Sequence, residues 1–322
     1  MNKDKDLDKI KNLEKLKETF SLVGEEVGKV IVGQEEVIKQ ILVAIITDSN
    51  ALLEGYPGMG KTMMIRTIAD VLDLKFRRIQ STPDLMPSDI TGTYVIEDHD
   101  GKKTFKFQPG PIFANIILAD ELNRATPKTQ SAMLEAMQEK QVTVGNTTFA
   151  LDRPFFVLAT QNPIEQEGTY PLPEAQTDRF LLKIAIDYPN AADELEIVNR
   201  ITKPDPELQK RVLLSKASII LLQKLVRQVP IANDIKTRAV QIVQKTRNMK
   251  NIIEYGASPR ASIGMVMAAK AKALIEGRKF VSEKDIEEMA YPVLRHRILL
   301  NFEAEREGKT TDDVIKDILS KK

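Results

Sequence analysis

The sequence predicts an α/β protein in which a parallel five-stranded sheet lies between helices and is followed by a smaller all-helical domain. Short apolar segments typical of buried strands alternate with helical patterns up to about residue 189, which favours parallel strands with helices on both faces. From residue 190 onward, helical patterns follow one another without intervening strands. We therefore expect residues 1–189 to form an N-terminal helix and the α/β core, and residues 190–322 to form the helical domain.

Composition argues against several classes of protein. The chain carries 47 Lys and Arg against 46 Asp and Glu, so its net charge of +1 gives no electrostatic argument for nucleic-acid binding. The absence of cysteine excludes a disulfide framework, and with only two histidines a structural zinc site is not expected. The chain starts without the apolar core of a signal peptide, and its longest apolar runs are far too short to cross a bilayer. We expect a cytoplasmic protein without membrane insertion.

Two helical patterns precede the first strand. Apolar residues recur through the charged segment 1–30, at Leu7, Ile10, Leu13, Leu16 and Phe20. We interpret this stripe as ordinary packing rather than as a face that binds a partner. The stretch Ile31-Val32-Gly33-Gln34 then leads into a second helix, which continues through Ile45 towards the strand.

The most informative motif stands between the first strand and the helix after it. Ala51 to Leu53 is a short apolar run, Gly55 opens a Gly/Pro-rich turn, and a helical pattern starts at Thr62. The spacing Gly55-x4-Gly60-Lys61-Thr62 matches a P-loop, whose backbone N–H groups and helix N-terminus bind the phosphates of a nucleoside triphosphate. In such a loop the lysine reaches the β- and γ-phosphates, and the threonine hydroxyl ligates Mg²⁺.

The P-loop predicts which residues hold the nucleotide. We assign the phosphate cradle to Gly55, Pro57, Gly58, Met59, Gly60, Lys61, Thr62 and Met63. The helix that follows Val32 and Gly33 comes directly before the P-loop strand, so we expect these two residues to wall an adenine pocket.

Four further strands are predicted, at about residues 75–80, 115–119, 155–160 and 180–186. Ligands of parallel sheets bind beyond the carboxyl ends of the strands, where the P-loop would meet Asp120, Glu121 and Asn162. Asp120 suits the magnesium sphere beside Thr62, and Glu121 suits activation or orientation of the water that attacks the γ-phosphate. Asn162 could bind the γ-phosphate or this water; alternatively, it orders the turn with Pro163.

Two hairpin patterns interrupt the alternation of strands and helices. Segments 94–97 and 104–107 flank the turn 98–101, and segments 141–144 and 147–150 flank Gly145-Asn146. Hairpins inserted into such a core are candidates for contact with a substrate or partner. We interpret His99, in the first turn, as a solvated loop residue rather than a ligand.

The C-terminal domain is predicted to contain helices at residues 218–229, 234–249, 259–276 and 283–300. Ser258-Pro259 fits an N-cap followed by proline at the first helical position, and Ser282 with Asp285 fits a capping box. Arg260 lies in the first turn of its helix, and Arg179 begins the last predicted strand. Taken alone, either arginine would be interpreted as an ordinary surface residue.

Seven motifs in this order resemble the MoxR family of AAA+ ATPases. They occupy residues 55–62, 119–125, 134–139, 159–163, 172–180, 256–261 and 293–297, and the resemblance spans roughly residues 20–300. It implies a nucleotide-binding core with a helical lid, ATP and Mg²⁺ as cofactors, and a ring, usually a hexamer, with ATP between subunits. The two hairpins match those that face the pore in related rings.

The resemblance also implies roles for individual residues. Asn162 is expected to be sensor 1, Arg260 to be sensor 2 from the lid, and Arg179 to be the arginine finger for the neighbour's ATP. Arg124 is a second interfacial candidate. Because the transition state spreads charge over the γ-phosphate oxygens, cations are needed from more sides than Lys61 can cover. The expected catalytic set is Lys61, Glu121, Asn162, Arg179 and Arg260.

We expect Mg²⁺-dependent ATP hydrolysis coupled to chaperone-like remodelling or maturation of a partner protein. The resemblance implies that the partner is a von Willebrand factor A-domain protein or its complex. The alternative is a DNA-associated AAA+ motor, which the balanced charge and the lack of an evident DNA-binding module disfavour. A nucleotide switch without hydrolysis is a second alternative, and the presence of Glu121 and Arg179 argues against it.

Overall fold

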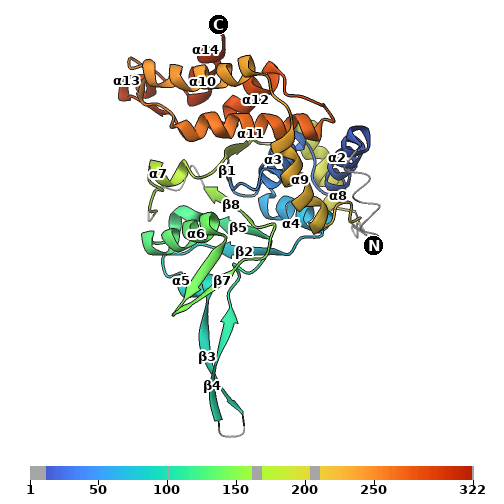
Figure 1. Ribbon diagram of the computed structural model, residues 1–322, viewed down its shortest axis with the longest axis vertical. Helices are drawn as coiled ribbons and strands as arrows, with labels where there is room; N and C mark the ends of the chain where they lie inside the picture. Colours follow the sequence, from blue (N-terminus) through green and yellow to red (C-terminus); the bar gives the residue numbers. More distant parts are fainter. Residues whose placement is uncertain (1–11, 100–101, 162–168, 204–210, 321–322) are drawn as a thin grey trace.

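Five parallel strands form the central sheet of the protein, for which the computed structural model describes residues 12–99, 102–161, 169–203 and 211–320 (Figure 1). The strand order is β2-β5-β8-β1-β9, and every neighbouring pair is parallel. The strands are β1 (Ala51–Gly55), β2 (Phe76–Gln80), β5 (Ile116–Asp120), β8 (Phe156–Gln161) and β9 (Leu182–Ile186). The predicted fold class is therefore confirmed, and the order places the carboxyl ends of β5, β8 and β1 side by side.

Both faces of the sheet are covered by helices. On β1, Ala51 and Leu53 belong to the apolar core shared with α2 (Leu13–Gly28), α3 (Glu35–Ile46) and α4 (Lys61–Val71). Leu52, between them, belongs to a second core on the opposite face, which includes residues of α6 (Pro127–Glu139). Alternate residues of one strand thus bury their side chains on opposite faces, which explains the apolar runs of the central strands β1, β5 and β8; β2, at the edge of the sheet, has exposed polar residues instead.

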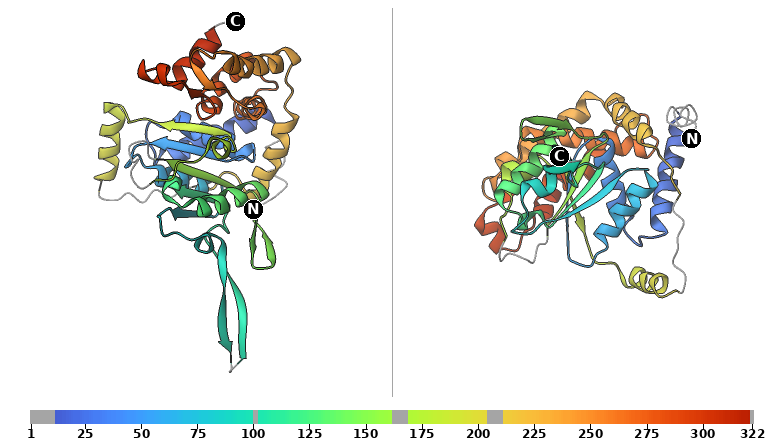
Figure 2. Two further views of the ribbon diagram at one scale, coloured as in Figure 1. Left: turned by 90° about the vertical axis from the view of Figure 1, so that its left-hand side faces the viewer. Right: turned by 90° about the horizontal axis from the view of Figure 1, so that it is seen from below.

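Both predicted hairpins are present. They are formed by β3 (Gly92–His99) with β4 (Lys102–Pro109), and by β6 (Gln141–Val144) with β7 (Thr147–Ala150). The first follows the short helix α5 (Pro87–Thr91) and projects from the body at the end opposite helices α10 to α14 (Figures 1 and 2). Phe107 stacks on Phe149 with ring centroids 4.2 Å apart, so the two hairpins are joined near the body of the protein.

Helices dominate the chain after β9. They are α8 (Ala191–Ile201), α9 (Lys216–Gln228), α10 (Asn233–Asn248), α11 (Pro259–Ile275), α12 (Glu283–Leu294), α13 (Phe302–Arg306) and α14 (Thr311–Ser320). The sequence did not predict α8, α13 or α14, nor the short helices η1 (Leu122–Arg124) and α7 (Glu174–Thr177). The boundary proposed at residues 189 and 190 stays a prediction.

One predicted helix is wrong in extent. The helix expected over 283–300 ends at Leu294, and Leu299–Leu300 instead forms β11, which pairs with β10 (Ile253–Tyr255). The chain turns between these elements because Arg297 is directed into the core, where its side chain bonds to Asp178. Local periodicity contains no signal for this long-range contact.

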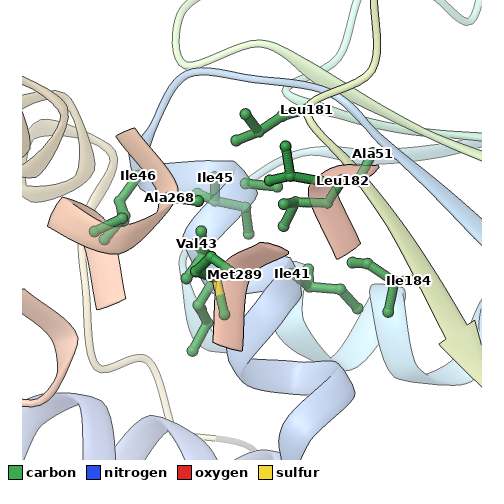
Figure 3. Close-up of a cluster of buried hydrophobic side chains, with 14 of the residues drawn as sticks. Ile41, Val43, Ile45, Ile46, Ala51, Leu181, Leu182, Ile184, Ala268 and Met289 are labelled. Atoms are coloured by element: carbon green, nitrogen blue, oxygen red, sulfur yellow. The ribbon is translucent and has the colours of Figure 1, made fainter. Parts of the chain in front are cut away.

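A shared apolar core joins the α/β core to the helices after it (Figure 3). Its labelled members come from α3, β1, β9 and the residue before it, α11 and α12: Ile41, Val43, Ile45, Ile46, Ala51, Leu181, Leu182, Ile184, Ala268 and Met289. A Cβ added to Gly264 on α11 would lie 3.0 Å from Leu181 Cδ1, so this helix packs closely on the segment before β9.

We predict that Leu182→Ala destabilises the protein by about 2–5 kcal/mol, because Leu182 is fully buried where the two parts meet and its truncation leaves a cavity. Urea denaturation measures the change. The matched control is Leu22→Ala on α2, whose side chain is exposed and whose loss should change stability by less than about 0.5 kcal/mol. Equal losses for the two variants would contradict the shared core.

Candidate active site

The P-loop opens onto a cavity of about 420 Å³ at the carboxyl edge of the sheet. Its lining includes the predicted cradle from Pro57 to Met63, together with Arg78, Asp120, Glu121 and Thr160. Gly58 and Gly60 have φ angles of 81° and 69°. An added Cβ would meet no atom within 4 Å at either position, so glycine is favoured there by backbone conformation rather than by lack of space. Gly60 is also the N-cap of α4, whose first N–H groups are available to phosphate.

Lys61 lies at the base of the cradle. Its Nζ donates a hydrogen bond of 2.6 Å to the carbonyl oxygen of Gly55. Burial lowers the pKa of Lys61, and the negative charges of Asp120 and Glu121 oppose this shift. Gly55 does not line this cavity but supplies the carbonyl oxygen that accepts from Lys61. It also allows close packing on β9, because a Cβ at this position would lie 2.8 Å from the carbonyl oxygen of Ile186.

Thr160 holds the two predicted acids together. Its Oγ1 donates to Asp120 Oδ1 at 2.6 Å and accepts from the backbone N–H of Glu121 at 2.8 Å. Glu121 itself adopts a left-handed backbone conformation, with φ of 54°, at the start of η1. The sequence did not identify Thr160 as functional, although its place near the end of β8, just before Asn162, was an available signal.

Arg78 is a further site residue that the sequence did not reveal. Its Nε and Nη2 contact Asp120 Oδ2 at 2.9 and 2.5 Å, and Nη2 also bonds to Gln80 Oε1. Gln80 Nε2 in turn donates to Glu121 Oε2 at 3.1 Å, and Arg124 Nε lies 3.0 Å from the same oxygen. Both acids are therefore ion-paired within the chain. No local pattern in the sequence indicates this role for Arg78, because only the pairing of β2 with β5 brings its side chain to Asp120.

A second, more apolar cavity of about 260 Å³ adjoins the first and shares Gly58, Met59, Gly60 and Met63 with it. Its other lining residues come from the segment before α3 and from the region of α8: Val30, Ile31, Val32, Gln34, Pro189, Ile197, Arg200 and Ile201. Val32 lines this cavity, and its predicted role in an adenine pocket stays a prediction.

Gly33 occupies a different place from its neighbour Val32. It has a φ of 71°, and an added Cβ would clash with the carboxylate of Asp193 in the first turn of α8. Gly33 therefore permits the close approach of α8 rather than lining the cavity. Arg200 fixes the same helix from its other end, since Nη1 donates to the carbonyl oxygens of Gly28 and Lys29 at 2.6 and 2.9 Å.

The predicted arginines lie elsewhere. Neither Arg179 nor Arg260 is among the described residues that line the P-loop cavity. Both line a separate cavity of about 510 Å³, which carries the side chains of five arginines: Arg153, Arg179, Arg227, Arg260 and Arg297. Arg179 Nη1 donates to Gln138 Oε1 at 2.6 Å, and Arg260 Nη1 lies 3.4 Å from Asp178 Oδ2. Asn162 lies outside the described residues, so its predicted role stays a prediction.

Comparison with known proteins identifies the family. Residues 50–182 match the ATPase family associated with various cellular activities (AAA), and residues 245–318 match the AAA lid domain. Chaperone MoxR1 of Mycobacterium tuberculosis is 42% identical over 302 residues, which cover 91% of this chain and 79% of that protein. The chain belongs to the MoxR family of AAA+ ATPases.

Two further similarities cover almost the whole chain of this MoxR-family ATPase. Protein YeaC of Bacillus subtilis is 45% identical over 296 residues, covering 92% of each chain. The crystal structure of a candidate ATPase from Cytophaga hutchinsonii superposes with a TM-score of 0.90 at 45% identity and covers 96% of each chain. The resemblance drawn from the motifs is confirmed, and the protein is an ATPase with a helical lid. Among the described residues, no helix is long and apolar enough to span a membrane.

We predict that Glu121→Gln keeps ATP binding but slows turnover about 10²- to 10⁴-fold, because glutamine has the shape of glutamate but cannot accept a proton from the attacking water. Phosphate release and fluorescent-nucleotide binding measure the two properties separately. The control is Glu18→Gln, an exposed acid on α2, which should leave both unchanged. Unchanged hydrolysis in the Glu121 variant would remove this residue from its role.

Proposed function

We propose that this MoxR-family ATPase works as a Mg²⁺-dependent ring, inactive as single protomers, that uses ATP hydrolysis to remodel or mature a partner protein. The observation that carries the proposal is the separation of the site into two surfaces. The P-loop and the two acids share one cavity, whereas Arg179 and Arg260 line another. Each protomer thus holds the nucleotide cradle in one place and presents cations in another.

The chemistry of phosphoryl transfer favours joining these surfaces across two protomers. Charge in the transition state is spread over the γ-phosphate oxygens, and an arginine supplied by a partner accelerates the analogous GTPase reaction by about 10³- to 10⁵-fold. Arg179 and Arg260 are both exposed. Arg179 follows Asp178 in the chain and Arg260 contacts the Asp178 carboxylate, so both arginines can reach the ATP of one neighbour. We therefore assign both arginines to the neighbour's site, with Arg260 acting from the lid across the interface. Arg124 contacts Glu121 of its own chain.

The oxygen donors of the P-loop cavity fit Mg²⁺. Thr62 and Asp120 line the same cavity, and Mg²⁺ prefers one or two carboxylates supplemented by phosphate oxygens and water. When bound, Mg²⁺ would neutralise charge on the β- and γ-phosphates. Arg78 already pairs with Asp120, so metal and arginine would compete for the same carboxylate.

The partner protein is proposed from the family and from the hairpins. The relative from Mycobacterium tuberculosis is named a chaperone, and we propose the same class of activity here, on a von Willebrand factor A-domain protein or its complex. The β3–β4 hairpin supports a contact with a protein, since Ile96 and Phe105 face each other across its strands and are both exposed. A hexameric ring would bring several such hairpins together.

We predict that Arg78→Met lowers the Mg²⁺ concentration needed for half-maximal nucleotide binding by about two- to fivefold. The reason is that Asp120 loses its competing cation, and a partly exposed ion pair is worth up to about 1 kcal/mol. Titration of Mg²⁺ against fluorescent-ADP binding measures this. Arg77→Met, at the adjacent position of β2, is the matched control and should leave the titration unchanged. An increased Mg²⁺ requirement in the Arg78 variant would contradict the competition.

We predict that Arg179→Ala abolishes turnover by itself but that mixing it with Lys61→Ala restores part of it. Neither variant can hydrolyse alone, because one lacks the finger and the other lacks the phosphate contact. In a mixed assembly, a Lys61→Ala protomer can present an intact Arg179 to the cradle of its neighbour. Phosphate release over a range of mixing ratios measures the recovery.

The control is a mixture of the Arg179→Ala variant with a double variant that carries both Lys61→Ala and Arg179→Ala. The double variant replaces the Lys61→Ala protein and lacks the arginine finger as well. This mixture has no intact Arg179 on any protomer and should stay inactive at every ratio. Absence of recovery in the single-variant mixture, with assembly confirmed by light scattering, would show that Arg179 does not act on a neighbour's ATP.

A further inference from the structure

Arg297 is a buried arginine whose hydrogen-bonding capacity is fully used. Its side chain is 3% exposed, and it lies just beyond the end of α12. Nε donates to Asp178 Oδ1 at 2.8 Å, Nη1 donates to the carbonyls of Leu181 and Val293, and Nη2 donates to the carbonyls of Asp178 and Phe180. A guanidinium has five N–H donors, and these five bonds match that number.

Four of these five bonds end on the short segment 178–181, which carries Arg179. The carbonyl oxygens on both sides of Arg179, those of Asp178 and Phe180, accept from the same nitrogen of Arg297 at 3.0 and 2.5 Å. The Phe180 ring is fully buried in the apolar core that also contains Leu52 and residues of α6. The backbone around Arg179 is therefore fixed, while the side chain of Arg179 remains exposed.

Asp178 connects this segment to a second element of the lid. Ser258 Oγ, at the N-cap of α11, donates to the two carboxylate oxygens of Asp178 at 3.1 and 2.9 Å. Arg260, two residues further along, lies 3.4 Å from Asp178 Oδ2. We call Asp178, Ser258 and Arg297 the Asp178 cluster. It joins the start of α11 and the end of α12 to the segment before β9.

We infer that the Asp178 cluster positions Arg179 and Arg260 as one unit for the ATP of the neighbouring protomer. Arg297 fixes the backbone that carries Arg179, and Asp178 holds Ser258 and Arg260 at a set distance from it. This inference rests on the proposed function, in which both arginines act across the interface. Arg297 and Ser258 act through Asp178 and the backbone of Arg179 in this arrangement; they are positioning residues.

A purely structural role for the cluster makes a different prediction. If Arg297 only stabilised the chain, its replacement would weaken every activity of the protomer, including nucleotide binding at its own P-loop. If it positions Arg179, the variant protomer keeps an intact cradle and loses only what it gives to its neighbour. Mixed assemblies separate these two cases, because a neighbour with an intact cluster can then supply the missing cations.

The test uses full-length Arg297→Lys, which keeps the positive charge but cannot make the same five bonds. We expect ATP binding within about twofold of the unchanged protein and turnover reduced about 10- to 100-fold, as for a misplaced catalytic group. Mixing with Lys61→Ala should restore turnover, because that variant carries an intact cluster and finger. Mixing with Arg179→Ala should restore none, because no protomer in that mixture presents a correctly placed Arg179.

The matched control is Arg295→Lys, two residues away, whose side chain pairs with Asp312 of α14. It should retain ordinary turnover. A second variant, Ser258→Ala, removes one link of the cluster without altering a buried charge, and it decides the question if Arg297→Lys fails to fold. We expect the turnover of Ser258→Ala to fall by about three- to tenfold and to be restored by mixing with Lys61→Ala. Ordinary turnover of the Ser258→Ala variant would overturn the inference.

The outcomes for the two proposals are distinguishable. Recovery in the mixture of Arg179→Ala with Lys61→Ala, but none when Arg297→Lys is mixed with Lys61→Ala, would overturn the positioning role and leave the proposed function intact. No recovery in either mixture would overturn action across the interface itself. A loss of ATP binding by Arg297→Lys that matches its loss of turnover would also overturn the inference.

Discussion

Parallel pairing of β5, β8 and β1 is the constraint on which the active site depends. The three strands run in the same direction and are neighbours in the sheet, so their carboxyl ends meet at one edge. The P-loop follows β1, Asp120 is the last residue of β5 with Glu121 directly after it, and Thr160 lies near the end of β8. Thr160 then links Asp120 to Glu121 by hydrogen bonds that need this register. Residues more than a hundred positions apart thus form one cavity.

The balance of charge at this edge is the physical reason for the second surface that we propose. Asp120 and Glu121 face Lys61, Arg78 and Arg124, so the acids are compensated within the chain. A triphosphate adds several negative charges to the same cavity, and Mg²⁺ and Lys61 offset only part of them. In the proposed assembly, the exposed Arg179 and Arg260 of a neighbour supply further positive charge. This arrangement brings charge to the nucleotide without burying more cations in each protomer.

Sequence patterns predicted what depends on local spacing, and missed what depends on pairing between distant elements. The central strands β1, β5 and β8 were found because residues buried on both faces form apolar runs, and the P-loop because its glycines and lysine have fixed spacing. Arg78 was missed because its role arises only when β2 pairs with β5. Helix α8 was missed although Leu195, Val198 and Ile201 recur at helical spacing, and in the structure these three side chains are exposed. The end of α12 was misplaced because the contact of Arg297 with Asp178 lies outside any local window.

The contacts between the lid and the core also indicate which movements hydrolysis can drive. Turning the lid against the core would break the four bonds from Arg297 to the segment 178–181 and open the apolar cluster around Leu181 and Leu182. Each Å² of apolar surface exposed in this way costs about 25 cal/mol, and an unpaired buried charge costs several kcal/mol more. Moving one protomer against the next breaks none of these contacts. The lid holds the segment that carries Arg179, so in the proposed assembly a change at a neighbour's nucleotide would be transmitted to the whole protomer. In the proposed ring, the least costly movement is therefore that of rigid protomers.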